Sequence, residues 1–308
     1  MSTGTNPDYG HELLFGTFVT PTNHPVHQAV EQAVVADRAG LDLVTFQDHP
    51  YVAKFHDTTT LLAYAAARTE QIHLSANVTN LPLRPPAVLA RAIATLDLLS
   101  GGRVELGIGA GAFWDGVAGM GGPRRTPGES IEALEEAIAI IRDVWNTDDP
   151  GVLSVRGKHY EVHGAKRGPA PAHPVGIWVG AYKPRIRGVV GRSADGWLPS
   201  MQYLQTGLHE LTQMNRHIDD SAVAAGRQPS DVRRFLNITG QFAAAGRGFL
   251  NGPPRQWAEE LAEVALTYGT SGFILASDDA SMTQTYAADV APAVTEMVAS
   301  ARGTLRRD

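Results

Sequence analysis

The sequence has no cysteine among its 308 residues. That absence excludes disulfide bonds, cysteine nucleophiles and metal sites built on thiolates. It also lacks any apolar run long enough to span a bilayer, and the polar segment 1–12 has no apolar core of the kind found in signal peptides. We therefore expect a cytoplasmic protein that does not contact a membrane.

Basic runs are missing too, and the formal net charge is −6. Binding to nucleic-acid phosphates needs concentrated positive charge, so nucleic acid is not an expected partner. Two histidine pairs, His24 with His27 and His159 with His163, have the spacing of metal ligands. Neither pair has an acidic residue or a cysteine at motif spacing, so we expect no metal site.

What the chain does have is a regular alternation of strand-like and helical segments. Eight strand-like runs each precede a helical run, and they cover residues 13–20, 41–48, 72–79, 103–108, 175–179, 196–199, 234–239 and 272–276. Such alternation predicts a parallel sheet, and eight units close into a (β/α)8 TIM barrel. The length suits a single domain over residues 1–308. In such barrels the active site lies on the loops that follow the strands.

One segment, residues 148–173, interrupts this alternation after the fourth helix. It holds two short apolar runs, 152–155 and 159–162, on either side of Arg156-Gly157-Lys158. This pattern predicts a β-hairpin, and a proline-rich stretch then returns to the barrel. We interpret the segment as an insertion rather than a second domain.

Several motifs, taken in order, resemble a known family. They are Gln47-Asp48-His49, the run LDLLSGGRVELGIGAG at 96–111, WVGA at 178–181 with Pro184, GRSADGW at 191–197 and VAPAV at 290–294. The chain resembles the bacterial-luciferase-like flavin-dependent oxidoreductases, including the branch that uses the deazaflavin coenzyme F420. The run at 96–111 is specific, whereas each of the others alone is weak.

The resemblance implies an oxidoreductase with coenzyme F420 or FMN as cofactor and a small organic molecule as substrate. With F420 the reaction is hydride transfer. With reduced FMN it is insertion of oxygen, and a flavin reductase becomes a partner. A non-catalytic flavin-binding barrel is a third hypothesis, because a fold alone does not prove turnover. The family also suggests a homodimer.

Two site residues follow the second strand. His49 is the residue we expect to act in catalysis, because a histidine can take or give a proton near neutral pH. The resemblance places an acid–histidine pair here, so Asp48 is expected to orient the imidazole or to bind the ring edge of the cofactor. The alternative without catalysis is a loop histidine whose ring is hydrogen-bonded to a neighbouring residue.

Glycines mark a second part of the expected site. Gly107, Gly109, Ala110 and Gly111 follow the fourth strand, where glycines let the backbone approach a phosphate, although a tight turn explains them equally well. Gly180, Ala181 and Lys183 follow the fifth strand and open a helix, which favours an anion. The resemblance assigns the cofactor phosphate to these two loops.

The third strand supplies the remaining candidates. By resemblance, the family has a non-prolyl cis peptide at Asn77–Val78, beneath the flavin ring, with Asn80 beside that ring. In the phosphosugar dehydrogenases of the F420 branch an acidic base follows the glycine run, but here that place holds Ala112, followed by Phe113 and Trp114. A phosphosugar substrate is therefore doubtful, and the two aromatic residues suggest an apolar wall. Trp178 is expected in the core.

Overall fold

A computed structural model describes residues 8–305 of the chain. The first seven residues of the polar segment 1–12 lie outside the described residues. The barrel strands are β1 (Leu14–Val19), β2 (Leu43–Phe46), β3 (His73–Ala76), β5 (Val104–Gly109), β8 (Ile177–Val179), β9 (Gly196–Trp197), β10 (Arg233–Ile238) and β13 (Gly272–Ala276).

The eight strands form a closed parallel barrel, as predicted. β1 pairs with both β2 and β13, and the pairing of β3 with β5 completes the ring. The third predicted strand is divided: β3 stops at Ala76, and a short β4 (Thr79–Asn80) pairs with the end of β5. The chain between them, Asn77–Val78, leaves the ladder.

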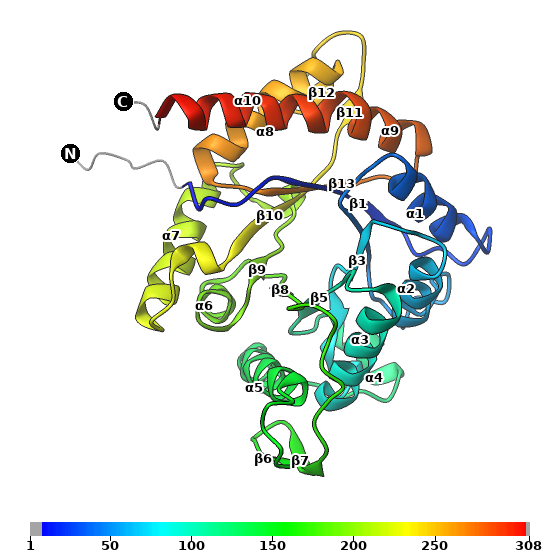
Figure 1. Cartoon of the computed structure of the whole chain (residues 1–308), viewed down its shortest axis with the longest axis vertical. Helices are drawn as coiled ribbons and strands as arrows, with labels where there is room; N and C mark the ends of the chain where they lie inside the picture. Colours follow the sequence, from blue (N-terminus) through cyan, green and yellow to red (C-terminus); the bar gives the residue numbers. More distant parts are fainter. Residues whose placement is uncertain (1–7, 306–308) are drawn as a thin grey trace.

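Helices surround the barrel (Figure 1). They are α1 (Gln28–Arg38), α2 (Thr58–Ala66), α3 (Pro86–Ser100), α4 (Trp114–Gly119), α5 (Pro127–Trp145), α6 (Pro184–Ser193), α7 (Glu210–Ala224), α8 (Pro254–Tyr268), α9 (Ala280–Thr285) and α10 (Ala291–Leu305). Thr126 begins α5 with a capping box that includes Glu129, and Gly101 ends α3 in the left-handed conformation. No helix of the described residues is long and apolar enough to cross a membrane.

The predicted hairpin is present. β6 (Leu153–Arg156) and β7 (Glu161–Ala165) pair in antiparallel fashion and extend beyond α5 in Figure 1. Glu136 of α5 accepts hydrogen bonds from the backbone N–H groups of the hairpin turn at Lys158, His159 and Tyr160. A second small pair, β11 (Gln241–Phe242) and β12 (Asn251–Gly252), follows β10.

The barrel interior is filled by large side chains facing small ones. Trp178 is buried there against Phe235, with ring centroids 4.5 Å apart, which confirms its predicted place in the core. A Cβ at Gly196 would lie 2.5 Å from the Trp178 ring, and one at Gly272 would lie 2.2 Å from the ring of Phe235. These two glycines therefore make the space that the aromatic rings occupy. Leu43, Leu198 and Ile274 complete this inner cluster.

Candidate active site

A cavity of about 400 Å³ opens at the C-terminal ends of the strands, where the barrel fold leads one to expect an active site. Its walls come from the segments that follow β1, β2, β3, β5, β8 and β9. The lining residues are Phe18, Gln47, Asp48, His49, Tyr51, Asn77, Val78, Thr79, Asn80, Gly109, Ala110, Gly111, Ala112, Phe113, Gly180, Tyr182, Ile186, Leu198, Ser200, Gln202 and Tyr203.

Most of the predicted site residues meet in this cavity. Those that line it are Asp48, His49, Asn77, Val78, Asn80, Gly109, Ala110, Gly111 and Gly180. Three do not: Gly107 lies deeper in β5, Ala181 is buried beneath the wall, and Lys183 is an exposed residue at the start of α6. The Ala181 carbonyl accepts a hydrogen bond from Trp197 Nε1 at 2.8 Å, which gives this residue a structural role.

The Asn77–Val78 peptide bond is cis, as predicted from the resemblance. The Asn77 amide is held from the opposite side of the barrel, because its Nδ2 donates to Asn237 Oδ1 at 2.7 Å. Asn237 in turn donates to Ser200 Oγ at 3.0 Å. Sequence analysis missed Asn237, although its position near the end of a barrel strand could have marked it.

Several glycines of the predicted phosphate loops make room for this segment. A Cβ at Gly107 would lie only 1.9 Å from the carbonyl oxygen of Ala76. A Cβ at Gly109 would lie 2.7 Å from Val78 Cγ2, and one at Gly180 would lie 3.4 Å from Val78 Cγ1. Packing around residues 76–78 therefore explains Gly107 and Gly109 without any ligand.

Two stretches of backbone near Val78 nevertheless carry N–H groups that donate no hydrogen bond within the described residues. Among residues 8–305, the N–H groups of Ala110, Gly111 and Ala112 donate to no protein acceptor, and neither do those of Ala181 and Tyr182. Gly111 has a φ of +102°, a conformation that glycine adopts without strain. Unpaired amides grouped in this way form a site for an anion such as a phosphate.

His49 lies half-buried in the cavity wall. Its Nδ1 shares a hydrogen bond of 2.8 Å with the Tyr51 hydroxyl, and Phe113 meets the imidazole edge-on with ring centroids 5.6 Å apart. Burial lowers the pKa of His49, and the nearby Asp48 charge opposes this effect only in part. Nε2 has no partner in the described part of the chain. The ring is thus a neutral base with one free nitrogen.

Asp48 does not orient the His49 ring, contrary to one of its two expected roles. Its carboxylate is bound by Arg84 through two bonds of 2.9 Å, from Nε to Oδ2 and from Nη2 to Oδ1. The backbone N–H of Asn80 adds a third bond, also 2.9 Å long. A buried carboxylate needs such partners, and the charge of Arg84 meets that need better than a neutral imidazole could.

Asn80 itself is buried at the cavity wall, and its Oδ1 has no hydrogen-bond partner in the described structure. Buried amide oxygens are rarely left unpaired, so this atom marks a place for a ligand donor.

Tyr51 and Tyr182 were also missed by sequence analysis. The Tyr182 hydroxyl accepts a hydrogen bond of 2.9 Å from the backbone of Ser200, and its ring meets Tyr203 edge-on.

Comparisons with known proteins add a second line of evidence. Residues 10–245 match the family model described as luciferase-like monooxygenase. An F420-dependent glucose-6-phosphate dehydrogenase of Amycolatopsis mediterranei is 32% identical over 216 residues, which is 68% of this chain and 63% of that protein. The relative of the same name in Kineococcus radiotolerans is 31% identical over 75% of this chain and 68% of that one.

Solved structures share the fold. An F420-dependent secondary alcohol dehydrogenase has a TM-score of 0.77 at 19% identity and covers 92% of this chain and 99% of that one. A monooxygenase of Streptomyces bottropensis has a TM-score of 0.76 at 18% identity, with 91% and 99% covered. The curated relative from Amycolatopsis is matched over less than two thirds of its length. The family match, which spans most of the chain, and the barrel with its cis peptide agree: this chain belongs to the luciferase-like monooxygenase family.

Proposed function

We propose that this protein is an oxidoreductase that transfers a hydride between an organic substrate and coenzyme F420. The observation that carries the proposal is the arrangement around Val78, where two stretches of unpaired amides flank a cavity that also holds a neutral histidine. The names of the curated relatives favour F420 over FMN. A homodimer and a cytoplasmic location stay predictions from the sequence.

The residues of the cavity fit such a cofactor. The amides of residues 110–112 and 181–182 would hold its phosphate, and the orphaned Asn80 Oδ1 would accept a hydrogen bond from a ring N–H. Asp48 contributes negative charge, but Arg84 balances it within the protein. When bound, F420 supplies a ring carbon that accepts or gives a hydride and reacts poorly with oxygen.

His49 supplies the proton chemistry in this proposal. An alcohol that loses a hydride from carbon must also lose a proton from oxygen, and a neutral imidazole can accept that proton. Nε2 accepts that proton in the tautomer in which Nδ1–H donates to the Tyr51 hydroxyl oxygen. In the reverse direction the same nitrogen returns the proton to a carbonyl oxygen.

The substrate that fits this cavity is neutral rather than phosphorylated. None of its lining residues is a lysine or an arginine. Tyr51, Phe113, Tyr182 and Tyr203 instead give it aromatic walls. In this proposal the cofactor phosphate takes the unpaired amides of residues 110–112 and 181–182, so a phosphate ester on the substrate would meet neither a cation nor a free amide. A small alcohol or ketone needs only one or two hydrogen bonds. We therefore propose a neutral secondary alcohol or the corresponding ketone as substrate.

A titration distinguishes the cofactors. Tight binding of F420 with weak binding of FMN supports the proposal, and the reverse result would favour a reduced-FMN monooxygenase fed by a flavin reductase. Reduction of F420 is then followed by its absorbance with neutral alcohols and with glucose 6-phosphate as separate substrates. Turnover of glucose 6-phosphate alone would refute the substrate class, and binding of F420 without any turnover would favour the non-catalytic hypothesis.

The role of His49 is tested by His49→Gln. We expect kcat to fall by about 10²–10⁴-fold, while the affinity for F420 stays within a few fold. His56→Gln is the matched control, because the His56 ring bonds to the carbonyl of Val26 at 3.0 Å and does not line the cavity. Unchanged kcat in His49→Gln would remove the residue from the mechanism.

A further inference from the structure

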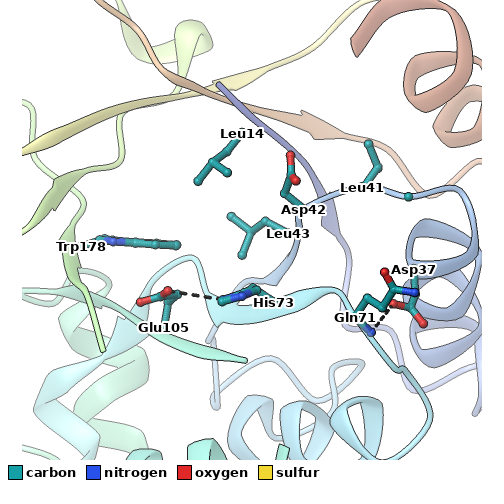
Figure 2. A pocket seen from close by; sticks show the side chains of 10 residues that line it. Leu14, Asp37, Leu41, Asp42, Leu43, Gln71, His73, Glu105 and Trp178 are labelled. Atoms are coloured by element: carbon teal, nitrogen blue, oxygen red, sulfur yellow. Dashed lines mark hydrogen bonds and ion pairs between the residues drawn. The ribbon is translucent and has the colours of Figure 1, made fainter. Parts of the chain in front are cut away.

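A second cavity, of about 370 Å³, opens at the other mouth of the barrel, where the strands begin. Leu14, Leu43 and Trp178 form its apolar side, and Asp42, His73 and Glu105 form part of its polar side. Figure 2 shows the His73 imidazole and the Glu105 carboxylate pointing toward one another, with Trp178 beside them. The proposed reaction uses none of these residues.

Three ligand atoms converge here from separate parts of the chain. His73 begins β3, Glu105 is the second residue of the neighbouring β5, and His173 lies in the segment before β8. Glu105 Oε1 is 3.4 Å from His73 Nδ1 and 3.3 Å from His173 Nε2, and all three atoms lie within 4.8 Å of one another.

These separations suit a metal ion better than they suit hydrogen bonds. Charge-assisted N–H···O bonds are about 2.7–2.9 Å long, so both contacts to Glu105 are loose. Two ligands on a tetrahedral zinc ion, each bonded at about 2.0–2.1 Å, lie roughly 3.3 Å apart. The two separations from Glu105 Oε1, 3.4 and 3.3 Å, match that geometry.

The neighbouring groups hold the ligands in place. The fully buried Asp97 binds His173 Nδ1 at 2.9 Å, which leaves Nε2 as the ligand atom. Histidine ligands of metals commonly have their second nitrogen held by a carboxylate in this way. The backbone N–H of Gly176 binds Glu105 Oε2 at 2.6 Å and leaves Oε1 free to face both histidines.

We propose that His73, Glu105 and His173 form a binding site for a zinc-type divalent cation at the N-terminal mouth of the barrel. Two imidazoles and one carboxylate are a ligand set that zinc accepts, and two of the three ligands, His73 and Glu105, line the cavity beside Trp178. The imidazole of His73 is partly exposed, so an ion can enter from solvent. The sequence-based expectation of no metal site considered only short spacings, and these three residues are far apart in the chain.

The test is titration of the metal-free full-length protein with Zn²⁺ by calorimetry, and with Co²⁺ by its visible absorption. We expect one ion per chain with micromolar or tighter affinity and the cobalt spectrum of a low-coordinate nitrogen–oxygen site. His73→Ala and Glu105→Gln should weaken binding at least about tenfold. His163→Ala is the matched control, because that exposed histidine also faces a carboxylate, Glu161, but has no third ligand among the residues that the structure describes.

His73→Ala carries the decision if Glu105→Gln fails to fold, since His73 is the more exposed of the two side chains. Zn²⁺ should raise the melting temperature of the wild type and of His163→Ala, but not that of His73→Ala. Zinc affinity that is equal in the wild type and His73→Ala, or weaker than micromolar in the wild type, would overturn the proposal. In that case the cluster is a network of ion pairs only. Neither result depends on the proposed oxidoreductase activity.

Discussion

Arg84 is the cation that makes the buried carboxylate of Asp48 tolerable, and replacing it by methionine tests this role. Methionine keeps much of the side-chain length but removes both bonds to Asp48. The side chain of Asp48 is 1% exposed and that of Arg84 is 18% exposed, so solvent cannot replace the guanidinium well. Removing one partner of a buried ion pair costs about 3–5 kcal/mol of unfolding free energy.

We expect a value near the lower end of that range, because the Asn80 N–H still binds the carboxylate. For a chain of 308 residues, a loss of about 3 kcal/mol corresponds to a melting temperature lower by roughly 5 °C. Arg124→Met is the matched control, since it removes the same group from a highly exposed pair with Asp115. Exposed pairs contribute about 0.2–1 kcal/mol, so this control should scarcely move the melting temperature.

The variant Asp48→Asn, alone and combined with Arg84→Met, completes a double-mutant cycle. In the Asp48→Asn background Arg84 still pairs with the half-exposed Asp57 but no longer neutralises a buried carboxylate. Arg84→Met should therefore cost at least about 1 kcal/mol less there than in the wild type. Thermal unfolding of the four proteins, followed by circular dichroism, supplies the comparison. An unfolding free energy of Arg84→Met within about 1 kcal/mol of the wild-type value would refute this account of the pair. So would a double variant whose loss equals the sum of the two single losses.

Two further predictions concern His49 and the glycines. Burial lowers the pKa of His49, so the imidazole stays neutral below the ordinary histidine pKa of about 6.5. As the pH falls, kcat/KM for alcohol oxidation should therefore decline only below about 6.5. A pH–rate profile whose acid limb has its midpoint above that pH would contradict this prediction. Gly107→Ala should destabilise the fold by about 1–3 kcal/mol or more, because the new Cβ would lie 1.9 Å from the Ala76 carbonyl oxygen. Gly119→Ala in α4 is its control, with nothing within 4 Å of the new Cβ and an expected gain of up to about 1 kcal/mol in chemical denaturation.

The barrel was predictable because its signals are local. Proline and glycine mark the ends of the helices, as at Gly101 and Thr126-Pro127, and each strand is a short apolar run between them. Alternation of such units admits few topologies. The cis peptide at Asn77–Val78 carries no local signal in the residues themselves and came only from the family resemblance. The division of the third strand into β3 and β4 was not predicted.

The partners within the site were harder to predict than its members. The family resemblance implied that Asp48 pairs with His49, but Asp48 binds Arg84, 36 residues away. A rule that a buried acid needs a cation would have prompted a search for one, although it could not have chosen among the arginines. A glycine can let the backbone approach a phosphate, or it can leave space for a neighbouring segment, and the sequence does not distinguish the two. Only the fold shows that Gly107 and Gly109 leave space for residues 76–78.

The single inner cluster of the barrel has a consequence for how this protein can change. Leu198 and Val78 line the cavity at one mouth, Leu43 and Trp178 line the cavity at the other, and all four pack in the same cluster. One layer of packed side chains thus separates the two cavities and lines both of them. Trimming Leu198 to admit a bulkier substrate would also loosen the support of Trp178, so selection for a wider substrate range would have to act on both ends of the barrel together.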